Sequence, residues 1–167
     1  MEKVIEGRVW KFGENVSTDA IAPGNFNLRA RPHEYALHVM EYTRPEFAKS
    51  VKQGDILVAD RNFGCGSSRE IAPMIIKIAG IEVILAKSFS RLFYRNAVNI
   101  GLPIIEIDTS DIEDGEILRV DMEAMTITKP NDPSYLVRFN FSEMEVKIIN
   151  EGGLLNYLEN HGSFDEL

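Results

Sequence analysis

The chain has 167 residues, of which 44% are hydrophobic and 26% are charged, with a formal net charge of −8. This composition is typical of a globular protein with one hydrophobic core, and we expect a single domain over residues 1–167. An acidic chain without a cluster of lysine and arginine predicts no nucleic-acid partner. No apolar run approaches the roughly 20 residues that span a bilayer, and the N-terminus has no apolar leader, so we expect a cytoplasmic protein without a membrane partner.

The chain contains one cysteine, Cys65. One cysteine excludes an internal disulfide and cannot by itself hold a zinc ion or an iron–sulfur cluster. The sequence therefore predicts that this chain binds no metal and no cofactor of its own.

The first sixty residues predict two strands and one helix. Residues 6–12 have the pattern of a strand that leads into a polar loop, and residues 54–60 that of a buried strand between turn residues. Pro32 is favourable at the start of a helix, in which Ala36, Val39 and Met40 fall at helical spacing.

The next part of the chain alternates between strand and helix patterns. A helix that ends at Gly80 has an apolar face expected at Ile71, Met74, Ile75 and Ile78. Strands are expected at residues 81–88 and 102–108, and a second helix at residues 89–100. This alternation predicts a parallel β-α-β-α-β core with the helices packed outside it.

The last third of the chain has a different pattern. Residues 116–122, 125–130 and 135–141 resemble short antiparallel strands, with turns at residues 123–124 and 131–134. Ser142 and Glu145 have the spacing of a capping box, and a last short helix follows two glycines. The predicted fold class is α/β with antiparallel additions.

The segment "NFGCGSSRE" joins a predicted strand to a predicted helix. Its glycines allow a close approach of the backbone, and the start of a helix favours an anion. Arg69 can bind a carboxylate through two hydrogen bonds, and a serine hydroxyl among such donors can be activated as a base. The alternative is that Ser67 or Ser68 only caps the helix while Arg69 is solvated. Known phosphate loops and the nucleophile elbow do not fit, because their required glycine and lysine positions are occupied by other residues.

Three segments, "STDAIAPG", "NFGCGSSRE" and "SFSRLFYRNAVNIGLP", resemble in their order the small subunits of 3-isopropylmalate dehydratase, in the aconitase superfamily. The resemblance implies a swivelling β/β/α domain like the C-terminal domain of aconitase. It also implies a large-subunit partner that carries a [4Fe–4S] cluster, which agrees with the lack of cluster ligands here. Cys65 is then a small residue packed in the turn.

The resemblance also implies roles for individual residues. Ser67 corresponds to a general base that removes a proton next to a carboxylate of the substrate, while the iron of the partner acts as a Lewis acid on the departing hydroxyl. Ser68 and Arg69 correspond to carboxylate-binding positions. Asp19 corresponds to an aspartate that orients a catalytic histidine of the other chain.

Substrate choice is expected to depend on the segment that contains Phe26, Leu28 and Arg29. In relatives whose substrate has a distal carboxylate, an arginine stands two places after an aromatic residue, where this chain has Leu28. A leucine suits a branched apolar group such as isopropyl, but Arg29 directly follows it. Homoaconitase and 2,3-dimethylmalate dehydratase therefore remain alternatives to a role in leucine biosynthesis.

Two functions of other classes are also open. A non-catalytic module that binds dicarboxylates would need Arg69 but no base at Ser67. A purely structural interaction domain would leave the paired serines unexplained. Arg91, Arg95 and Asn96 of the second predicted helix are interpreted as a solvated polar face.

Overall fold

The computed structural model describes residues 4–24 and 31–162, and these form seven strands and seven helices. The strands are β1 (Val4–Lys11), β2 (Asp55–Ala59), β3 (Ile81–Ala86), β4 (Ile104–Glu106), β5 (Ile117–Asp121), β6 (Thr126–Lys129) and β7 (Asp132–Arg138). The helices are α1 (Thr18–Ile21), α2 (Pro32–Ala36), α3 (Phe47–Ser50), α4 (Ile71–Ala79), α5 (Arg91–Asn99), α6 (Glu143–Asn150) and α7 (Leu154–His161).

The strands form one sheet in the order β4-β3-β2-β1-β5-β6-β7. Strands β1 to β4 are parallel to one another, and β1 also pairs antiparallel with β5 along its opposite edge. Strands β5, β6 and β7 then follow as an antiparallel meander. The predicted mixture of a parallel core with antiparallel additions is therefore confirmed.

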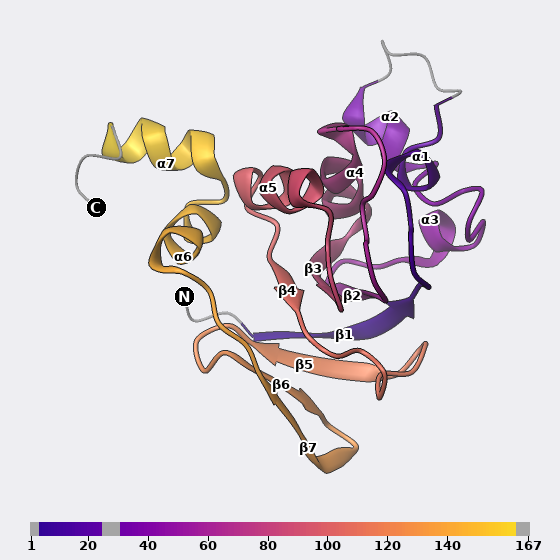
Figure 1. Cartoon of the computed structure of the whole chain (residues 1–167), viewed down its shortest axis with the longest axis vertical. Coiled ribbons are helices and arrows are strands. Elements are labelled where there is room, and N and C mark those ends of the chain that lie inside the picture. Colours follow the sequence, from indigo (N-terminus) through magenta and orange to yellow (C-terminus); the bar gives the residue numbers. More distant parts are fainter. Residues whose placement is uncertain (1–3, 25–30, 163–167) are drawn as a thin grey trace.

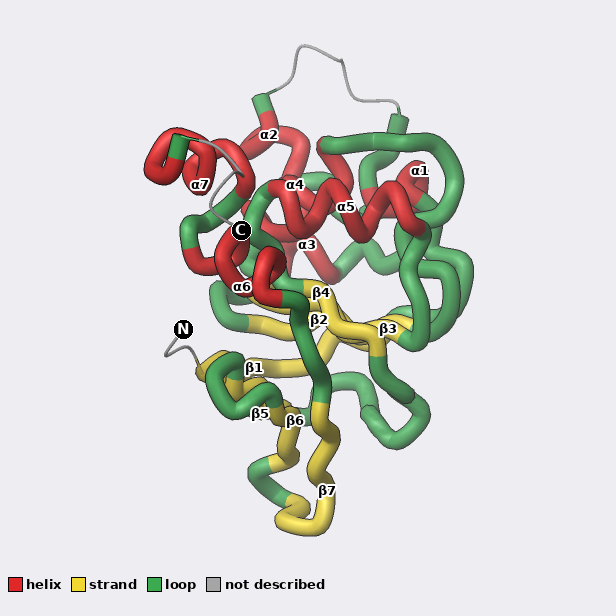
Figure 2. The backbone as a smooth tube through the Cα atoms, turned by 60° about the vertical axis from the view of Figure 1, so that its left-hand side comes forward, coloured by secondary structure: helices red, strands yellow, loops and turns green. Residues whose placement is uncertain are grey.

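The two faces of the sheet contact different cores. One core joins side chains of β1, β2 and β3 to helices α1 to α5, with Trp10, Phe47 and Phe93 among its largest members. The other joins the opposite face of the parallel strands to the antiparallel strands and to α6, around Ile5 and Leu118. Figures 1 and 2 show α1 to α5 gathered on one side of the sheet, while β6 and β7 project away from it.

Several local predictions were wrong in detail. The helix that begins at Pro32 ends at Ala36, and the buried Val39 and Met40 lie in the turns that follow it. The predicted turn over residues 131–134 is shorter, because β7 already begins at Asp132. A proline is tolerated there because β7 is an edge strand.

The buried face of α4 is shifted by one residue from the predicted one. Its fully buried residues are Ala72, Pro73, Ile75 and Ile76, whereas Ile71, Met74 and Ile78 are half-buried. Nearly every position of this helix is apolar, and α2 and α5 cover it in addition to the sheet. Periodicity alone could therefore not fix the face.

The capping box of α6 is confirmed, since the Ser142 hydroxyl accepts a hydrogen bond from the Glu145 amide and the Glu145 carboxylate accepts one from the Ser142 amide. None of the helices in the described ranges combines the length and the hydropathy that crossing a membrane requires.

Candidate active site

Two motifs that are far apart in the sequence meet beside the parallel strands. The segment before α1 and the loop between β2 and α4 form a bridge between Ser17 and Cys65. The Thr18 amide donates to the Cys65 carbonyl over 2.8 Å, and the Gly64 amide donates to the Val16 carbonyl over 2.8 Å. These backbone contacts bring "STDAI" and "GCGSSRE" into one site.

Ser67 and Ser68 are both exposed in this site. Helix α4 begins at Ile71, its N-cap residue is Glu70, and no side chain caps it. The interpretation of the serines as simple caps is therefore wrong in this structure. Their hydroxyls are available to a molecule that approaches from outside.

Thr18, the first residue of α1, forms hydrogen-bond contacts with Ser67. Its side chain is only 2% exposed, and its hydroxyl donates to the Ser67 carbonyl over 2.7 Å. The Thr18 oxygen also lies 3.5 Å from the Ser67 hydroxyl oxygen, at the long limit of a hydrogen bond. Because the one hydrogen of Thr18 is used by the carbonyl, its oxygen can only accept from Ser67. Sequence reasoning missed this residue, since the contact joins positions 49 apart.

Arg69 lies in the same loop and contacts α1. Its guanidinium is 2.8 Å from a carboxylate oxygen of Asp19 and donates to the Ala22 carbonyl over 3.1 Å. The Asp19 side chain is 64% exposed and that of Arg69 is 33% exposed. An exposed ion pair contributes little stability, so either group can exchange its partner for a substrate or for another chain.

The two glycines of the loop have different surroundings. Gly64 has a φ of +76°, and a Cβ there would lie 2.2 Å from the ring of Phe93, so only glycine fits. Because its amide donates to Val16, Gly64 cannot offer that amide to a substrate. Gly66 has a φ of +93° but only ordinary contacts around its Cβ position.

Ser90 fixes the loop from the side of α5. Its hydroxyl caps that helix by accepting from the Phe93 amide and also donates to the Gly64 carbonyl over 2.8 Å. Its amide donates to the Phe63 carbonyl over 2.9 Å. The loop that carries Ser67 is thus held by α1 on one side and by α5 on the other.

The predicted specificity residues Phe26, Leu28 and Arg29 lie outside the described residues. Within the described ranges, no three histidine, cysteine, aspartate or glutamate side chains are arranged to hold a metal ion. Cys65 is a free, half-buried cysteine. A single cysteine cannot supply the thiolate ligands of an iron–sulfur cluster.

Comparison with known proteins assigns a family to this arrangement. Residues 9–110 match the aconitase C-terminal domain family, which defines the class of the fold and of the loop that carries Ser67. The chain is 50% identical to the 3-isopropylmalate dehydratase small subunit 1 of Thermotoga maritima, over 98% of this chain and 100% of the relative. It is 48% identical to the homoaconitase small subunit of Methanothermobacter thermautotrophicus, over 94% of this chain and 92% of the relative.

A solved structure gives the same result. The crystal structure of 3-isopropylmalate dehydratase from Methanocaldococcus jannaschii is similar with a TM-score of 0.90 and 43% identity, over 96% of each chain. The chain therefore belongs to the family of 3-isopropylmalate dehydratase small subunits, in the aconitase superfamily. The small-subunit names of its relatives imply a large-subunit partner.

Proposed function

We propose that this chain, together with a large subunit, interconverts 2-isopropylmalate and 3-isopropylmalate by dehydration and rehydration through isopropylmaleate. The identity to dehydratase small subunits supports this reaction. The observation that carries the proposal is that the buried Thr18 contacts the exposed Ser67, while Arg69 of the same loop pairs with Asp19 of the same helix as Thr18. In this proposal the whole chain acts as one domain that closes over its partner.

Ser67 is the base in this mechanism. In its alkoxide form its oxygen takes the proton from the carbon next to a substrate carboxylate and becomes a hydroxyl, which returns the proton in the rehydration step. Arg69 binds that carboxylate by exchanging Asp19 for the substrate, and Ser68 adds a hydroxyl donor. Asp19, once released, is free to orient a histidine of the large subunit. A [4Fe–4S] cluster in the large subunit would supply a Lewis acid for the departing hydroxyl.

The base role predicts a clear difference between two neighbouring serines. Ser67→Ala should lower kcat by roughly 10²–10⁴-fold in the assembled enzyme, because a positioned base contributes about that factor. Ser68→Ala is the matched control and should act mainly on KM, since Ser68 only binds. The test mixes each variant with a cluster-reconstituted large subunit without oxygen and follows isopropylmaleate hydration. Full activity of Ser67→Ala would leave a non-catalytic dicarboxylate-binding module as the better description.

A homoaconitase or a 2,3-dimethylmalate dehydratase is the second candidate. It is favoured by the homoaconitase relative at 48% identity and by Arg29, which follows Leu28 in the predicted specificity segment. Isopropylmaleate, homoaconitate and dimethylmaleate should be assayed side by side. A preference for isopropylmaleate would make Leu28 the selector, whereas a preference for homoaconitate would mean that Arg29 reaches the distal carboxylate.

A further inference from the structure

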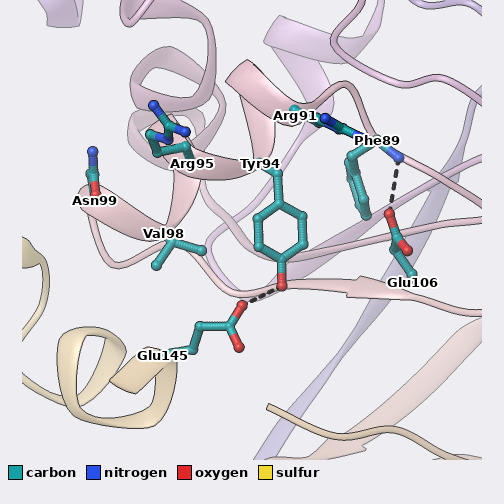
Figure 3. Close-up of a pocket in the computed structure, with 8 residues that line it drawn as sticks. All are labelled: Phe89, Arg91, Tyr94, Arg95, Val98, Asn99, Glu106 and Glu145. Atoms are coloured by element: carbon teal, nitrogen blue, oxygen red, sulfur yellow. Dashed lines mark hydrogen bonds between the residues drawn. The ribbon is translucent and has the colours of Figure 1, made fainter. Parts of the chain in front are cut away.

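The outer side of α5 forms a pocket that the mechanism above does not use. It has a volume of about 440 Å³ and lies between α5, the end of β4 and the start of α6 (Figure 3). Phe89 and Val98 give it an apolar wall, and Arg91 and Arg95 stand one helical turn apart along it. Figure 3 shows the Tyr94 ring between Arg95 and Phe89, with its hydroxyl directed to Glu145.

The two acids of this pocket, Glu106 and Glu145, already accept hydrogen bonds from within the chain. The Glu145 carboxylate accepts hydrogen bonds from Tyr94 and from Ser142, and Glu106 accepts one from the Phe89 amide over 3.3 Å. Burial, followed by the hydrogen bond to Glu145, raises the pKa of Tyr94, so this phenol stays a neutral donor.

The two arginines of the pocket, Arg91 and Arg95, differ from these acids in their exposure and in their contacts. Both are exposed, and neither has an ion-pair or hydrogen-bond partner in the part of the chain that the structure describes. Between them the side chain of Leu92 is 47% exposed. The chain has a net charge of −8, and two exposed arginines beside an exposed leucine differ from the acidic character of the chain as a whole. Arginine is enriched in protein interfaces relative to the rest of the surface.

This surface is fixed to the catalytic loop. Ser90, directly before α5, bonds the Gly64 carbonyl, and the Phe93 ring fills the space beside Gly64. Helix α5 is therefore in direct contact with the loop that carries the exposed Ser67, so a partner that covers Ser67 lies close to the start of α5. That continuity favours a protein partner over a small molecule as the occupant.

We infer that Arg91, Leu92 and Arg95, with the pocket beside them, form a docking surface for the large subunit. The fitting partner segment has carboxylates opposite the two guanidinium groups and an apolar side chain that enters the pocket lined by Phe89, Tyr94 and Val98. The inference rests on the proposed function in one respect, because the partner is the chain that completes the Ser67 site.

The test measures association between this chain and the large subunit. Arg91→Glu combined with Arg95→Glu should raise Kd by about 10–100-fold and weaken the dependence of association on salt, since charge steering acts mainly on the association rate. Arg138→Glu on β7 is the matched control, because Arg138 is also exposed and without a partner in the described ranges, and it should leave Kd unchanged. Circular dichroism checks that each variant is folded, and Leu92→Asp provides a second disruption if the double variant does not fold.

Two results would overturn the inference. One is an equal Kd for the double variant and for Arg138→Glu. The other is a combination of binding results. If the isolated chain binds citrate, Arg95→Glu abolishes that binding, and the Arg95→Glu variant still assembles with the large subunit, the pocket is an anion site. Ser67→Ala should assemble with unchanged Kd, so a failure of the base role and a failure of the docking surface give different results.

Discussion

Thr18 is the residue whose effect on Ser67 is easiest to isolate. Its buried hydroxyl donates a hydrogen bond to the Ser67 carbonyl over 2.7 Å, away from the exposed side of the site. Thr18→Val keeps the shape and removes that hydrogen bond, which should cost about 1 kcal/mol of stability. We also expect kcat to fall by about tenfold with little change in KM, because Ser67 loses its orientation rather than the substrate its binding group. Urea unfolding and steady-state kinetics of the assembled enzyme measure the two effects.

Thr18→Ser is the control for this substitution, since it keeps the hydroxyl and removes only a methyl group. It should recover most of kcat. If Thr18→Val and Thr18→Ser have the same kcat, the hydroxyl has no positioning role and the contact is only structural.

At the residue scale, the sequence indicated Ser67, Ser68, Arg69 and Asp19 as candidate site residues, but neither Thr18 nor the contacts among them. Ser67 and Arg69 stand in one short segment, so their neighbourhood follows from local geometry. The contacts of Thr18 with Ser67 and of Asp19 with Arg69 join residues about fifty positions apart. Only the pairing of the β2–α4 loop with the segment before α1 brings them together, and no local pattern encodes that pairing.

At the scale of elements, the contact between the β2–α4 loop and α5 depends on Gly64. Gly64→Ala places a Cβ 2.2 Å from the Phe93 ring and forces an alanine to a φ of +76°. We expect a loss of about 3 kcal/mol or more, because overpacking and an unfavourable φ add together. Gly66→Ala shares the positive φ but finds its nearest neighbour at 3.7 Å, so it should cost only about 1–2 kcal/mol.

Thermal or urea unfolding of both alanine variants tests this difference, with Gly13→Ala as a reference. Gly13 has no atom within 4 Å of its Cβ position and should be nearly neutral. Equal losses for Gly64→Ala and Gly66→Ala would show that backbone strain alone, and not the contact with Phe93, makes glycine necessary.

The elements themselves were largely predictable, while their arrangement was not. Alternating strand and helix patterns indicated the parallel core, and three short strand patterns indicated the antiparallel addition. That β1 lies in the middle of the sheet, between β2 and β5, could not be read from the sequence. The strand has apolar residues toward both cores, and any strand buried on both faces has this pattern, whichever strands it pairs with.

At the scale of the whole molecule, Arg44 connects segments that are distant in the chain. Its guanidinium donates to both carboxylate oxygens of Asp114, over 2.7 and 2.9 Å, and to Glu46. It also lies 4.6 Å from the ring centre of Trp10, the only tryptophan of the chain. Trp10 is 1% exposed and donates to Asp55 over 2.8 Å. Its fluorescence therefore reports the unfolding of the core next to this contact.

The contact between Arg44 and Asp114 predicts how stability depends on acid. The hydrogen bonds from Arg44 hold the pKa of Asp114 below its ordinary value, and burial opposes them only in part. A carboxylate with a lowered pKa contributes stability that is complete above the pKa of the unfolded chain, near 4, and is lost as the pH falls through the lowered value. Wild type should therefore lose stability steadily below about pH 4, as followed by Trp10 fluorescence in urea.

Arg44→Lys tests whether this contact causes part of that loss. Lysine keeps the charge but cannot bind both oxygens of Asp114 while it covers the Trp10 ring, so stability at neutral pH should fall by about 1–2 kcal/mol. Because the pKa of Asp114 would then lie closer to its ordinary value, the acid-dependent decrease should become shallower. Arg119→Lys is the control, since the side chain of Arg119 is half exposed and its contact with Glu6 is long, at 3.7 Å. If Arg44→Lys and wild type lose the same stability between pH 5 and 3, the Arg44 contact does not govern the acid response, and other carboxylates must.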